Sequence, residues 1–372
     1  MSVEIKVVSS KSLLRQYINF PFVLYKDDPY WTPPLISDEL SYYNPLKNTN
    51  LVQNPYVLYL AYSNGKIVGR IMGLINLNAN ELRKESLVRW NFLDSYDEEE
   101  IVVGLLNAVE KWGKEKGMQA VVGPRGFTDQ EPQGAMIEGF DERAPIGTHY
   151  NRPYLVEYIA GNGYSKDVDW VCYKAKIPKE LPEKYLSIVQ RILKGSTLTC
   201  IDFKTKAQMK PYILPIMNLL NETYVGIYGF APMSEEEMGN LAKKYLPVLD
   251  PRFICVIEDK GKLVAFAITM PDITEGLKKA KGKLFPFGIF HILKAQKNSK
   301  ILQLLLIGVH ADYRGRGLFT MFAERIKKSA TDANMEWIDS HLQLEDNLNI
   351  RKWLMALNGE VYRKYRAFKK EL

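Results

Sequence analysis

The chain has 372 residues, 46% hydrophobic and 25% charged, the composition of an ordinary globular protein. At roughly 150 residues per domain this length predicts two or three domains, and the composition excludes a disordered chain. Apolar stretches such as 301–309 are shorter than the roughly 20 residues that span a bilayer, and the N-terminus has no apolar signal region. We therefore expect a cytoplasmic protein.

The net charge of +7 is distributed unevenly. Residues 1–178 carry 19 Lys+Arg against 22 Asp+Glu, whereas residues 179–372 carry 31 against 21. The second half is therefore the one expected to meet an anion, although charge alone does not choose between nucleic acid, anionic lipid and a phosphorylated cofactor.

The three cysteines, Cys172, Cys200 and Cys255, lie far apart among apolar or β-branched neighbours. The sequence offers neither a disulfide framework nor the CxxC spacing of a zinc cluster. We expect all three to be buried strand residues, and we predict no metal site.

The first half, residues 1–178, has the pattern of a mixed α/β domain. Strands 56–62 and 66–75 are joined by Ser63-Asn64-Gly65, a strong hairpin signal. The pattern then predicts, in order, a strand at 88–94, a helix at 98–116, a strand at 119–125, a helix around 153–160 and a strand at 168–175. The charged segment 176–184 contains two prolines and predicts a linker.

Residues 179–372 repeat this order of elements. Ser234 and Glu237 form a capping box at the start of one predicted helix. The expected elements are a strand at 196–203, helices at 206–224 and 234–245, strands at 252–258, 263–270 and 301–309, a helix at 318–333, a strand at 336–342, a helix at 347–357 and a strand at 361–368. The repeat is one of element order and not of residue identity, so a chance match of two α/β halves is the alternative.

A strand-to-turn-to-helix motif carries the chemistry. Residues 309–318 read VHADYRGRGL, and two glycines lead from an apolar strand directly into an amphipathic helix. Unpaired amides at a helix N-terminus attract phosphate, and glycine allows its close approach. Arg314 and Arg316 add charged donors. The motif predicts a phosphate site, and a tight turn with solvated arginines is the alternative.

This motif resembles the signature of the GNAT superfamily of acyl-CoA-dependent N-acyltransferases, Arg/Gln-x-x-Gly-x-Gly/Ala. Arg314, Gly317 and Phe319 stand at its three defined positions. The first half, including the segment FPFVLYKDDPYWTPPL, looks like the leading part of a bacterial family of uncharacterised tandem-GNAT proteins. The resemblance implies two tandem α/β (α+β) GNAT-like domains, 1–178 and 179–372, each with a mixed central sheet flanked by helices.

The resemblance also implies where acetyl-CoA or another acyl-CoA binds. Its pyrophosphate is expected on the amides of Gly315, Arg316, Gly317, Leu318 and Phe319, beside Arg314. Its pantetheine is expected to pair like an extra strand with Leu306, Ile307, Gly308 and Val309, where neighbouring strands part. Asn347 stands where such proteins often place an asparagine near the cofactor.

The sequence departs from the family's pattern at several positions. Phe319 replaces a glycine or alanine and must point away from the cofactor, and Gln303 stands where many members carry a glutamate. Trp353, Leu354 and Met355 occupy the region of a common tyrosine acid. In the first half, LDSYDEEE at 93–100 holds no glycine and repels a pyrophosphate, so we expect a degenerate copy without a cofactor.

Direct acyl transfer to an amine needs a proton acceptor, because an alkyl ammonium has a pKa near 10.4. His341 is the preferred base, on the predicted strand with Trp337 and Asp339 on the same face, and His310 and Gln303 are the other candidates. A structural histidine bonded to a neighbouring carbonyl is the alternative for His341. A backbone N–H near Val309 is the expected oxyanion donor.

An insertion at 272–300 carries seven lysines against two acids and the apolar run LFPFGIF at 284–290. It is long for a connection between two strands. Residues 278–290 are interpreted as a substrate lid or as a peripheral contact with an anionic membrane, and a flap that packs on the first half is the third possibility.

The leading functional hypothesis is an acyl-CoA-dependent N-acyltransferase whose acceptor is a small-molecule or peptide amine. A relative of the tandem-GNAT aminoacyltransferases that use charged tRNA is a second hypothesis, although we expect no nucleic-acid partner because no basic-aromatic motif stands out. A non-catalytic CoA-binding or partner-binding protein is the third. The acceptor, the acyl length and the oligomeric state do not follow from the sequence.

Overall fold

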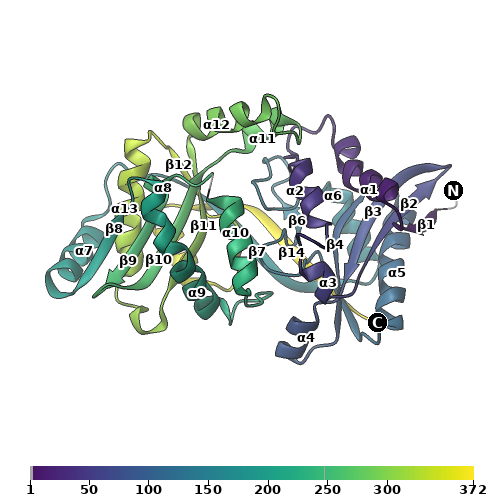
Figure 1. Ribbon diagram of the computed structural model, residues 1–372, viewed down its shortest axis with the longest axis horizontal. Coiled ribbons are helices and arrows are strands. Elements are labelled where there is room, and N and C mark those ends of the chain that lie inside the picture. The colour runs from purple at the N-terminus through teal and green to yellow at the C-terminus, as the bar shows by residue number, and fades with distance from the viewer. Residues whose placement is uncertain (1–2, 247) are drawn as a thin grey trace.

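The computed structural model describes residues 3–246 and 248–372, which contain one mixed 14-stranded sheet with helices on both faces (Figure 1). The order along the sheet is β1-β2-β3-β4-β5-β14-β7-β12-β11-β10-β9-β8, with β6 on β14 and β13 on β7. The first-half strands are β1 (Glu4–Val7), β2 (Tyr56–Ser63), β3 (Lys66–Leu74), β4 (Leu87–Ser95), β5 (Ala120–Gly123), β6 (Ala135–Glu138) and β7 (Ser165–Lys176). The second-half strands are β8 (Leu198–Asp202), β9 (Ile254–Asp259), β10 (Lys262–Pro271), β11 (Ile301–Val309), β12 (Trp337–Asp339), β13 (Gln343–Leu344) and β14 (Glu360–Glu371).

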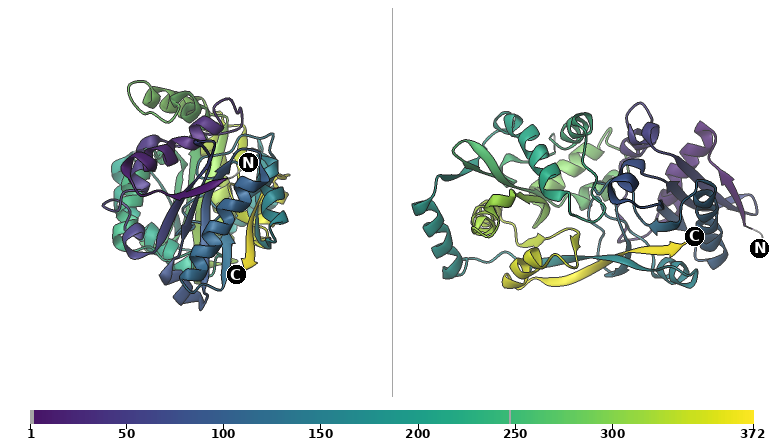
Figure 2. Two further views of the ribbon diagram at one scale, coloured as in Figure 1. Left: turned by 90° about the vertical axis from the view of Figure 1, so that its right-hand side faces the viewer. Right: turned by 90° about the horizontal axis from the view of Figure 1, so that it is seen from below.

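The two halves, divided at residue 178, exchange their last strands. β7 ends the first half of the sequence but pairs antiparallel with β12 of the second. β14 ends the chain but pairs antiparallel with β5 of the first half, and β7 and β14 pair with each other at the centre of the sheet. Figure 2 shows the yellow C-terminal strand running from the second half into the first. Each half therefore completes the sheet of the other.

In the first half, helices cover both faces of the sheet because their apolar stripes need a partner layer. On one face α5 (Glu99–Glu115) and α6 (Pro153–Gly161) pack over Trp90 and Val121. On the other face α1 (Lys11–Leu24), α2 (Ile36–Tyr42) and α3 (Asn50–Gln53) contribute to a core with Leu60 and Met72. The short α4 (Leu77–Arg83) follows β3.

The second half repeats this layering. α13 (Leu318–Asp332), α7 (Glu183–Gly195) and α14 (Leu348–Ala356) contribute to the core on one face of the sheet. α8 (Lys206–Met209), α9 (Ile213–Tyr224) and α10 (Glu235–Tyr245) cover the opposite face. Between β10 and β11 lie α11 (Thr274–Ala280) and α12 (Gly288–Asn298), at the top of the molecule in Figure 1.

Most predicted strands and helices are present, including the hairpins and the capping box at Ser234. The predicted strand 336–342 is wrong beyond Asp339, because an irregular stretch in which His341 takes a φ of 56° interrupts the pairing with β7 until β13. The predicted helix 206–224 is divided into α8, a short 3₁₀ turn containing Pro211, and α9, since proline removes a helical amide. Cys172 and Cys255 are buried, whereas Cys200 is only half-buried.

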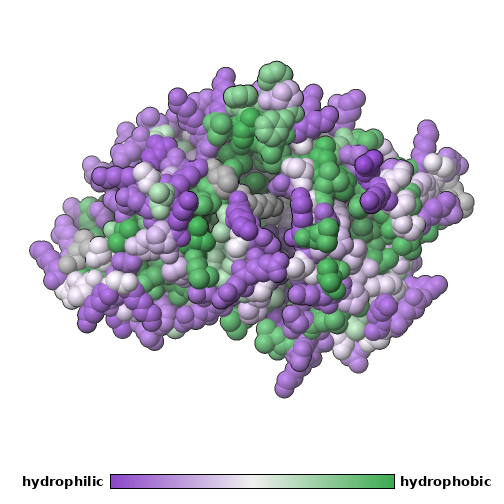
Figure 3. Space-filling view, in the orientation of Figure 1, coloured by the Kyte–Doolittle hydropathy of each residue, from purple (hydrophilic) through white to green (hydrophobic). Residues whose placement is uncertain are grey.

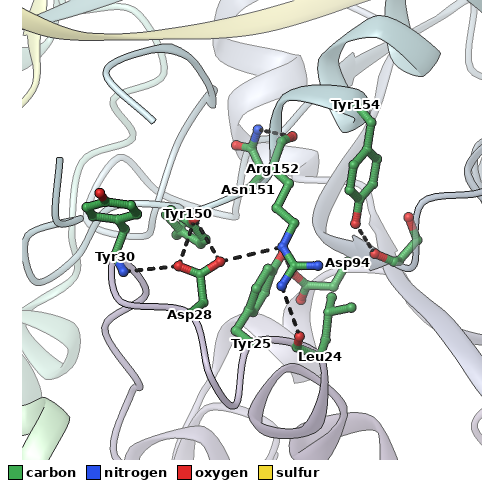
Figure 4. Close-up of polar contacts among 10 residues, drawn as sticks. Leu24, Tyr25, Asp28, Tyr30, Asp94, Tyr150, Asn151, Arg152 and Tyr154 are labelled. Carbon is green, nitrogen blue, oxygen red and sulfur yellow. Dashed lines mark hydrogen bonds and ion pairs between the residues drawn. The ribbon is translucent and has the colours of Figure 1, made fainter. Parts of the chain in front are cut away.

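A network of polar contacts fixes the segment after α1 (Figure 4). The Asp28 carboxylate accepts hydrogen bonds from the Tyr150 hydroxyl at 2.9 Å and from the Tyr30 amide at 3.0 Å. Arg152 forms an ion pair with Asp28 at 3.5 Å, and Tyr25 donates to Asp94 at 2.9 Å. These contacts fix the position of residues 25–34, which we call the platform. The insertion between β10 and β11 lies against this platform.

Candidate active site

The site begins where two strands part. β11 pairs antiparallel with β10 over most of its length, but it pairs parallel with β12 only from Ile301 to Gln303. Beyond Gln303 no strand within residues 3–246 and 248–372 pairs with Leu304–Val309 on the β12 side, where only the Tyr224 and Arg314 side chains bond the Ile307 and Val309 carbonyls. The predicted parting of strands beside residues 306–309 is therefore present.

A cavity of about 930 Å³ lies along this free edge. One wall is the free edge together with the turn before α13. A second wall is apolar and comes mainly from α8, α9 and α10, with lining residues Met209, Ile213, Ile216, Met217, Leu241, Leu246 and Leu249. A third wall is polar and comes from the first half, with Asp129, Gln130, Glu131 and Gln133. The cavity thus lies between the two halves of the chain.

The glycine turn has the backbone that its sequence predicts. Gly315 and Gly317 have φ values of 75° and 85°, a conformation that strains other residues. The space around Gly315 is open, whereas a Cβ on Gly317 would lie 2.7 Å from Ile192 Cδ1 of α7. α7 therefore covers Gly317, and Gly315 is the glycine that leaves room for an anion.

The structure brings most of the predicted cofactor residues to the cavity. The lining residues among them are Leu306, Ile307, Gly308, Val309, Arg314, Gly315, Phe319 and Asn347. Arg316, Gly317 and Leu318 are not lining residues: Arg316 stacks on Tyr313, and the Leu318 side chain is buried in the core. Phe319 packs edge-on against Phe322 but still borders the cavity.

The three catalytic candidates differ in position. His341 lines the cavity, and its Nε2 lies 2.9 Å from the carbonyl oxygen of Ile146. His310 lies outside the cavity lining, with Nε2 3.1 Å from Glu222. Gln303 is buried and donates to Asp272 at 3.3 Å, away from the lining. His341 thus forms the carbonyl contact of a structural histidine at the cavity wall.

Tyr224 of α9 reaches the free edge of β11. Its hydroxyl donates to the Ile307 carbonyl at 3.1 Å and lies 3.4 Å from the Ile307 amide. Burial raises the pKa of Tyr224 to about 12, with a further contribution from the nearby carboxylate of Asp129. The hydroxyl therefore stays protonated near neutral pH and stands at the strand edge as a hydrogen-bond donor.

The loop between β5 and β6, residues 124–134, forms the polar wall. The Oδ1 atom of Asp129 and the Oε1 atom of Gln133 are both buried without a hydrogen-bond partner. Burial raises the pKa of Asp129 to about 6. Glu131 differs, because its carboxylate accepts hydrogen bonds from the Tyr42 hydroxyl at 2.6 Å and from the Phe127 amide at 3.2 Å.

The same loop closes the corresponding gap of the first half. β4 pairs parallel with β5 only from Leu87 to Arg89, so these two strands also part. Here the Arg125 amide bonds the Trp90 carbonyl at 2.8 Å, and Asn91 binds both the Pro132 carbonyl and His149. The chain itself occupies the edge that stays free in the second half.

The sequence did not identify Tyr224, Asp129 or Gln133 as site residues. Tyr224 stands 83 positions before Ile307, the strand residue that it contacts. Asp129 and Gln133 belong to the other half of the chain, and only the strand exchange brings them to the cavity. No group of His, Cys, Asp or Glu that could hold a metal ion occurs in residues 3–246 and 248–372.

Two relatives match nearly the whole chain, although no family model matches it. Protein YghO of Escherichia coli (strain K12) is 25% identical over 378 residues, covering 99% of this chain and 95% of that protein. A bacterial ceramide synthase of Caulobacter vibrioides (strain NA1000 / CB15N) is 26% identical over 373 residues, covering 98% and 96%.

Solved structures share the architecture. A tandem GNAT protein from the clavulanic acid biosynthesis pathway superimposes with a TM-score of 0.56 at 11% identity, covering 100% of this chain and 98% of that one. A GCN5-related N-acetyltransferase from Sphaerobacter thermophilus gives a TM-score of 0.50 at 10% identity, covering 99% and 95%. The chain thus has the tandem GNAT fold along its length, as its sequence predicts.

Proposed function

We propose that this protein is an acyl-CoA-dependent N-acyltransferase that joins a long acyl chain to a long-chain amine. The observation that carries the proposal is the cavity, which connects the free edge of β11 with a large apolar chamber beneath α9 and α10. Its volume of about 930 Å³ is near the upper end of the roughly 300–1,000 Å³ usual for ligand sites. An acetyl group would leave most of this chamber empty.

The residues present fit an acyl-CoA. The free edge at Leu304–Val309 offers backbone partners for the pantetheine, whose amides pair as a strand does. Gly315, Arg314 and the N-terminus of α13 offer amides and charge for the pyrophosphate. Acyl-CoA would supply an activated thioester, whose carbonyl is open to attack by an amine.

The Caulobacter relative supports the choice of substrates. A ceramide is an amide between a fatty acid and a long-chain amino alcohol, so its two apolar tails need more apolar wall than an acetylated product does. Isoleucine, leucine and methionine from α8, α9 and α10 form such a wall in this protein. The proposed acceptor is therefore an amine with an alkyl tail.

Tyr224 is placed to assist the departure of the CoA thiol. Its hydroxyl contacts the strand edge where the pantetheine is expected, and it replaces functionally the tyrosine that α14 lacks. We propose that it donates a hydrogen bond to the sulfur as the C–S bond breaks. His341, held by the Ile146 carbonyl, is proposed to shape the wall beside the amine.

The test is release of free CoA thiol with palmitoyl-CoA or acetyl-CoA as donor and sphinganine, hexadecylamine or ethanolamine as acceptor. We expect the fastest turnover with palmitoyl-CoA and a long-chain amine, with the amide identified by mass spectrometry. CoA binding without amide formation from any of these amines would instead favour a non-catalytic CoA-binding protein.

Binding stoichiometry is a separate prediction. We expect isothermal titration of the full chain with CoA to give one site per chain, because residues 124–134 fill the gap of the first half and Glu99 and Glu100 occupy the first turn of α5. Two sites per chain would contradict the assignment of the first half as a copy without cofactor.

A further inference from the structure

Two acceptor oxygens of the loop 124–134 are buried beside the cavity. Among the described residues, Asp129 Oδ1 and Gln133 Oε1 have no hydrogen-bond partner, and both residues line the cavity. An unpaired buried polar atom costs roughly 1–3 kcal/mol. The same loop also leaves Arg125 Nε and Nη2 unpaired, but Arg125 does not line the cavity. A ligand in the cavity with N–H or O–H donors would satisfy both oxygens.

The loop that carries these atoms is held in place from several sides. Gln133 donates to the Asp129 carbonyl at 3.1 Å, and the Gly134 amide bonds the Pro124 carbonyl at 2.9 Å. Arg125 stacks on Tyr228 of the second half, 4.4 Å from the ring centroid. Because the loop is fixed to both halves, its free oxygens have a defined position relative to β11.

Asp129 also lies close to the place where the thioester is expected. Its charge acts on Tyr224, whose hydroxyl is bonded to Ile307 at the free strand edge. The helix α9 carries Tyr224 and also forms a wall of the apolar chamber. An acceptor whose alkyl tail fills the chamber therefore has its amine head toward Asp129. The carboxylate, the strand edge and the chamber thus border the same cavity.

We propose that Asp129 and Gln133 form the site for the amine head of the acceptor, and that Asp129 accepts its proton. This inference rests on the proposed N-acyltransferase function. The amine nitrogen attacks the thioester carbonyl carbon, the C–N bond forms and the nitrogen gives a proton to Asp129 Oδ1. The C–S bond breaks, and the proton held by Asp129 passes through water to the departing thiolate, so that CoA leaves as the free thiol.

Charge supports this assignment. Burial raises the pKa of Asp129 to about 6, so its carboxylate is ionised at neutral pH but basic enough to take a proton. The titratable groups around this part of the cavity include Arg125 and Glu131 from its own loop, Tyr228 stacked on Arg125, Tyr224 from α9 and His341 after β12. Glu131 is a weaker candidate, because Tyr42 and the Phe127 amide already occupy its carboxylate.

The first test is catalytic. Asp129→Asn is expected to lower kcat/KM by about 100-fold or more with a long-chain amine while CoA affinity is retained, the loss typical of a missing general base. The wild-type rate should fall as the pH drops below about 6, and the variant should lack this limb. Asp141→Asn, on an exposed loop, is the control and should keep wild-type activity.

The second test needs no chemistry and separates this proposal from the proposed function. Without CoA, the wild type should bind hexadecylamine more tightly than hexadecanol in a thermal-shift titration, and Asp129→Asn should lose that preference. If the preference is absent, or if Glu131→Gln abolishes turnover and Asp129→Asn does not, the assignment of Asp129 is wrong. If the preference is present but no amine is acylated, only the proposed function fails.

The insertion between β10 and β11 has an apolar outer surface. Its exposed large side chains are Phe285 at 79%, Phe287 at 68%, Phe290 at 66% and Leu293 at 51%. Figure 3 shows this apolar surface gathered over α11 and α12, above a hollow between the two halves. The exposed lysines of this segment are Lys279, Lys281, Lys283, Lys294, Lys297 and Lys300.

The insertion is fixed to the rest of the molecule and reaches the cavity wall. The Ile36 amide bonds the Gly282 carbonyl at 2.8 Å, and Lys278 donates to the Pro29 carbonyl on the platform after α1. On its inner side, Leu277 and Ile292 pack in one cluster with Ile146 and Leu305, which line the cavity. Residues 272–300 are not themselves lining residues, so the lid hypothesis has no contact to support it.

We infer that this Phe- and Lys-rich face docks on an anionic membrane surface. Its aromatic side chains suit insertion among lipid headgroups, and its lysines complement anionic lipid. None of the helices among the described residues is long and apolar enough to cross a bilayer. Docking here brings the lipids that would supply the substrates near the cavity wall of Ile146 and Leu305, on which the insertion packs.

Sedimentation with vesicles tests this face without any substrate. The full chain should bind phosphatidylglycerol vesicles at low salt, bind less at high salt, and bind phosphatidylcholine vesicles weakly. The triple variant Phe285→Ser, Phe287→Ser, Phe290→Ser should lose about tenfold or more in affinity, which converts to about 1.4 kcal/mol. Leu46→Ser, at an equally apolar position that is 95% exposed, is the control and should bind as the wild type does. No binding at low salt, or full binding by the triple variant, would overturn the inference.

Discussion

Gly315→Asp is expected to weaken CoA binding about 100-fold, a loss of roughly 3 kcal/mol, because it places a carboxylate where the pyrophosphate should lie. The space around Gly315 is open, so the new side chain meets no steric obstacle. Its φ of 75° is tolerated better by Asp and Asn than by other residues. The measurement is isothermal titration of the full chain with CoA.

Gly315→Asn is the matched control for charge. It has nearly the same shape and the same tolerance of positive φ as the aspartate, but it carries no charge. Its CoA affinity should stay within about threefold of the wild type, since only repulsion of phosphate distinguishes the two variants. Equal losses in both would show that the turn does not hold an anion. Gly317 is less suitable for this test, because a side chain there meets Ile192 of α7.

Met217→Trp is expected to lower turnover with palmitoyl-CoA and a long-chain amine by about tenfold or more, because the larger ring fills part of the apolar chamber. Met217 is only 8% exposed and lies on the cavity wall formed by α9. The affinity for CoA itself should stay unchanged, since Met217 belongs to the apolar wall and not to the strand edge or the glycine turn. The comparison is kcat/KM for a series of acyl-CoA and amine chain lengths.

Met217→Leu controls for disturbance of the core. Leucine conserves volume and apolar character, and such an exchange usually costs less than about 1.5 kcal/mol. It should therefore leave chain-length preference unchanged, and thermal unfolding of both variants should report their stability. If Met217→Trp keeps its activity with the longest chains, the chamber does not hold an alkyl tail.

Much of the cofactor part of the site follows from local sequence. The apolar strand, two glycines and amphipathic helix at 301–333 are adjacent in the chain, so their pattern predicts the turn that the structure contains. The free edge of Leu304–Val309 also matches the expectation from the resemblance. These features depend on backbone preferences over a few residues, which a sequence records directly.

The acceptor part of the site does not follow from local sequence. Asp129 and Gln133 reach the cavity because β7 and β14 cross between the halves, a long-range arrangement that no spacing reports. His341 was placed on a strand by its alternating pattern, but β12 ends at Asp339 and His341 lies in the irregular stretch before β13, where the chain pairs with β7 again. In the same way, α11 and α12 were not expected within the lysine-rich insertion, whose helices are short and stabilised by packing.

The exchange of β7 and β14 has a consequence for how the chain folds. While a ribosome is still making the protein, residues 1–178 lack β14, the strand that covers the edge of β5, until the last twelve residues of the fold are available. An emerging first half therefore holds an open strand edge, which is an aggregation hazard during synthesis. Both halves then gain their closing strands almost together, so we expect one cooperative unfolding transition. We also expect slow refolding, because the closing contacts join distant parts of the sequence.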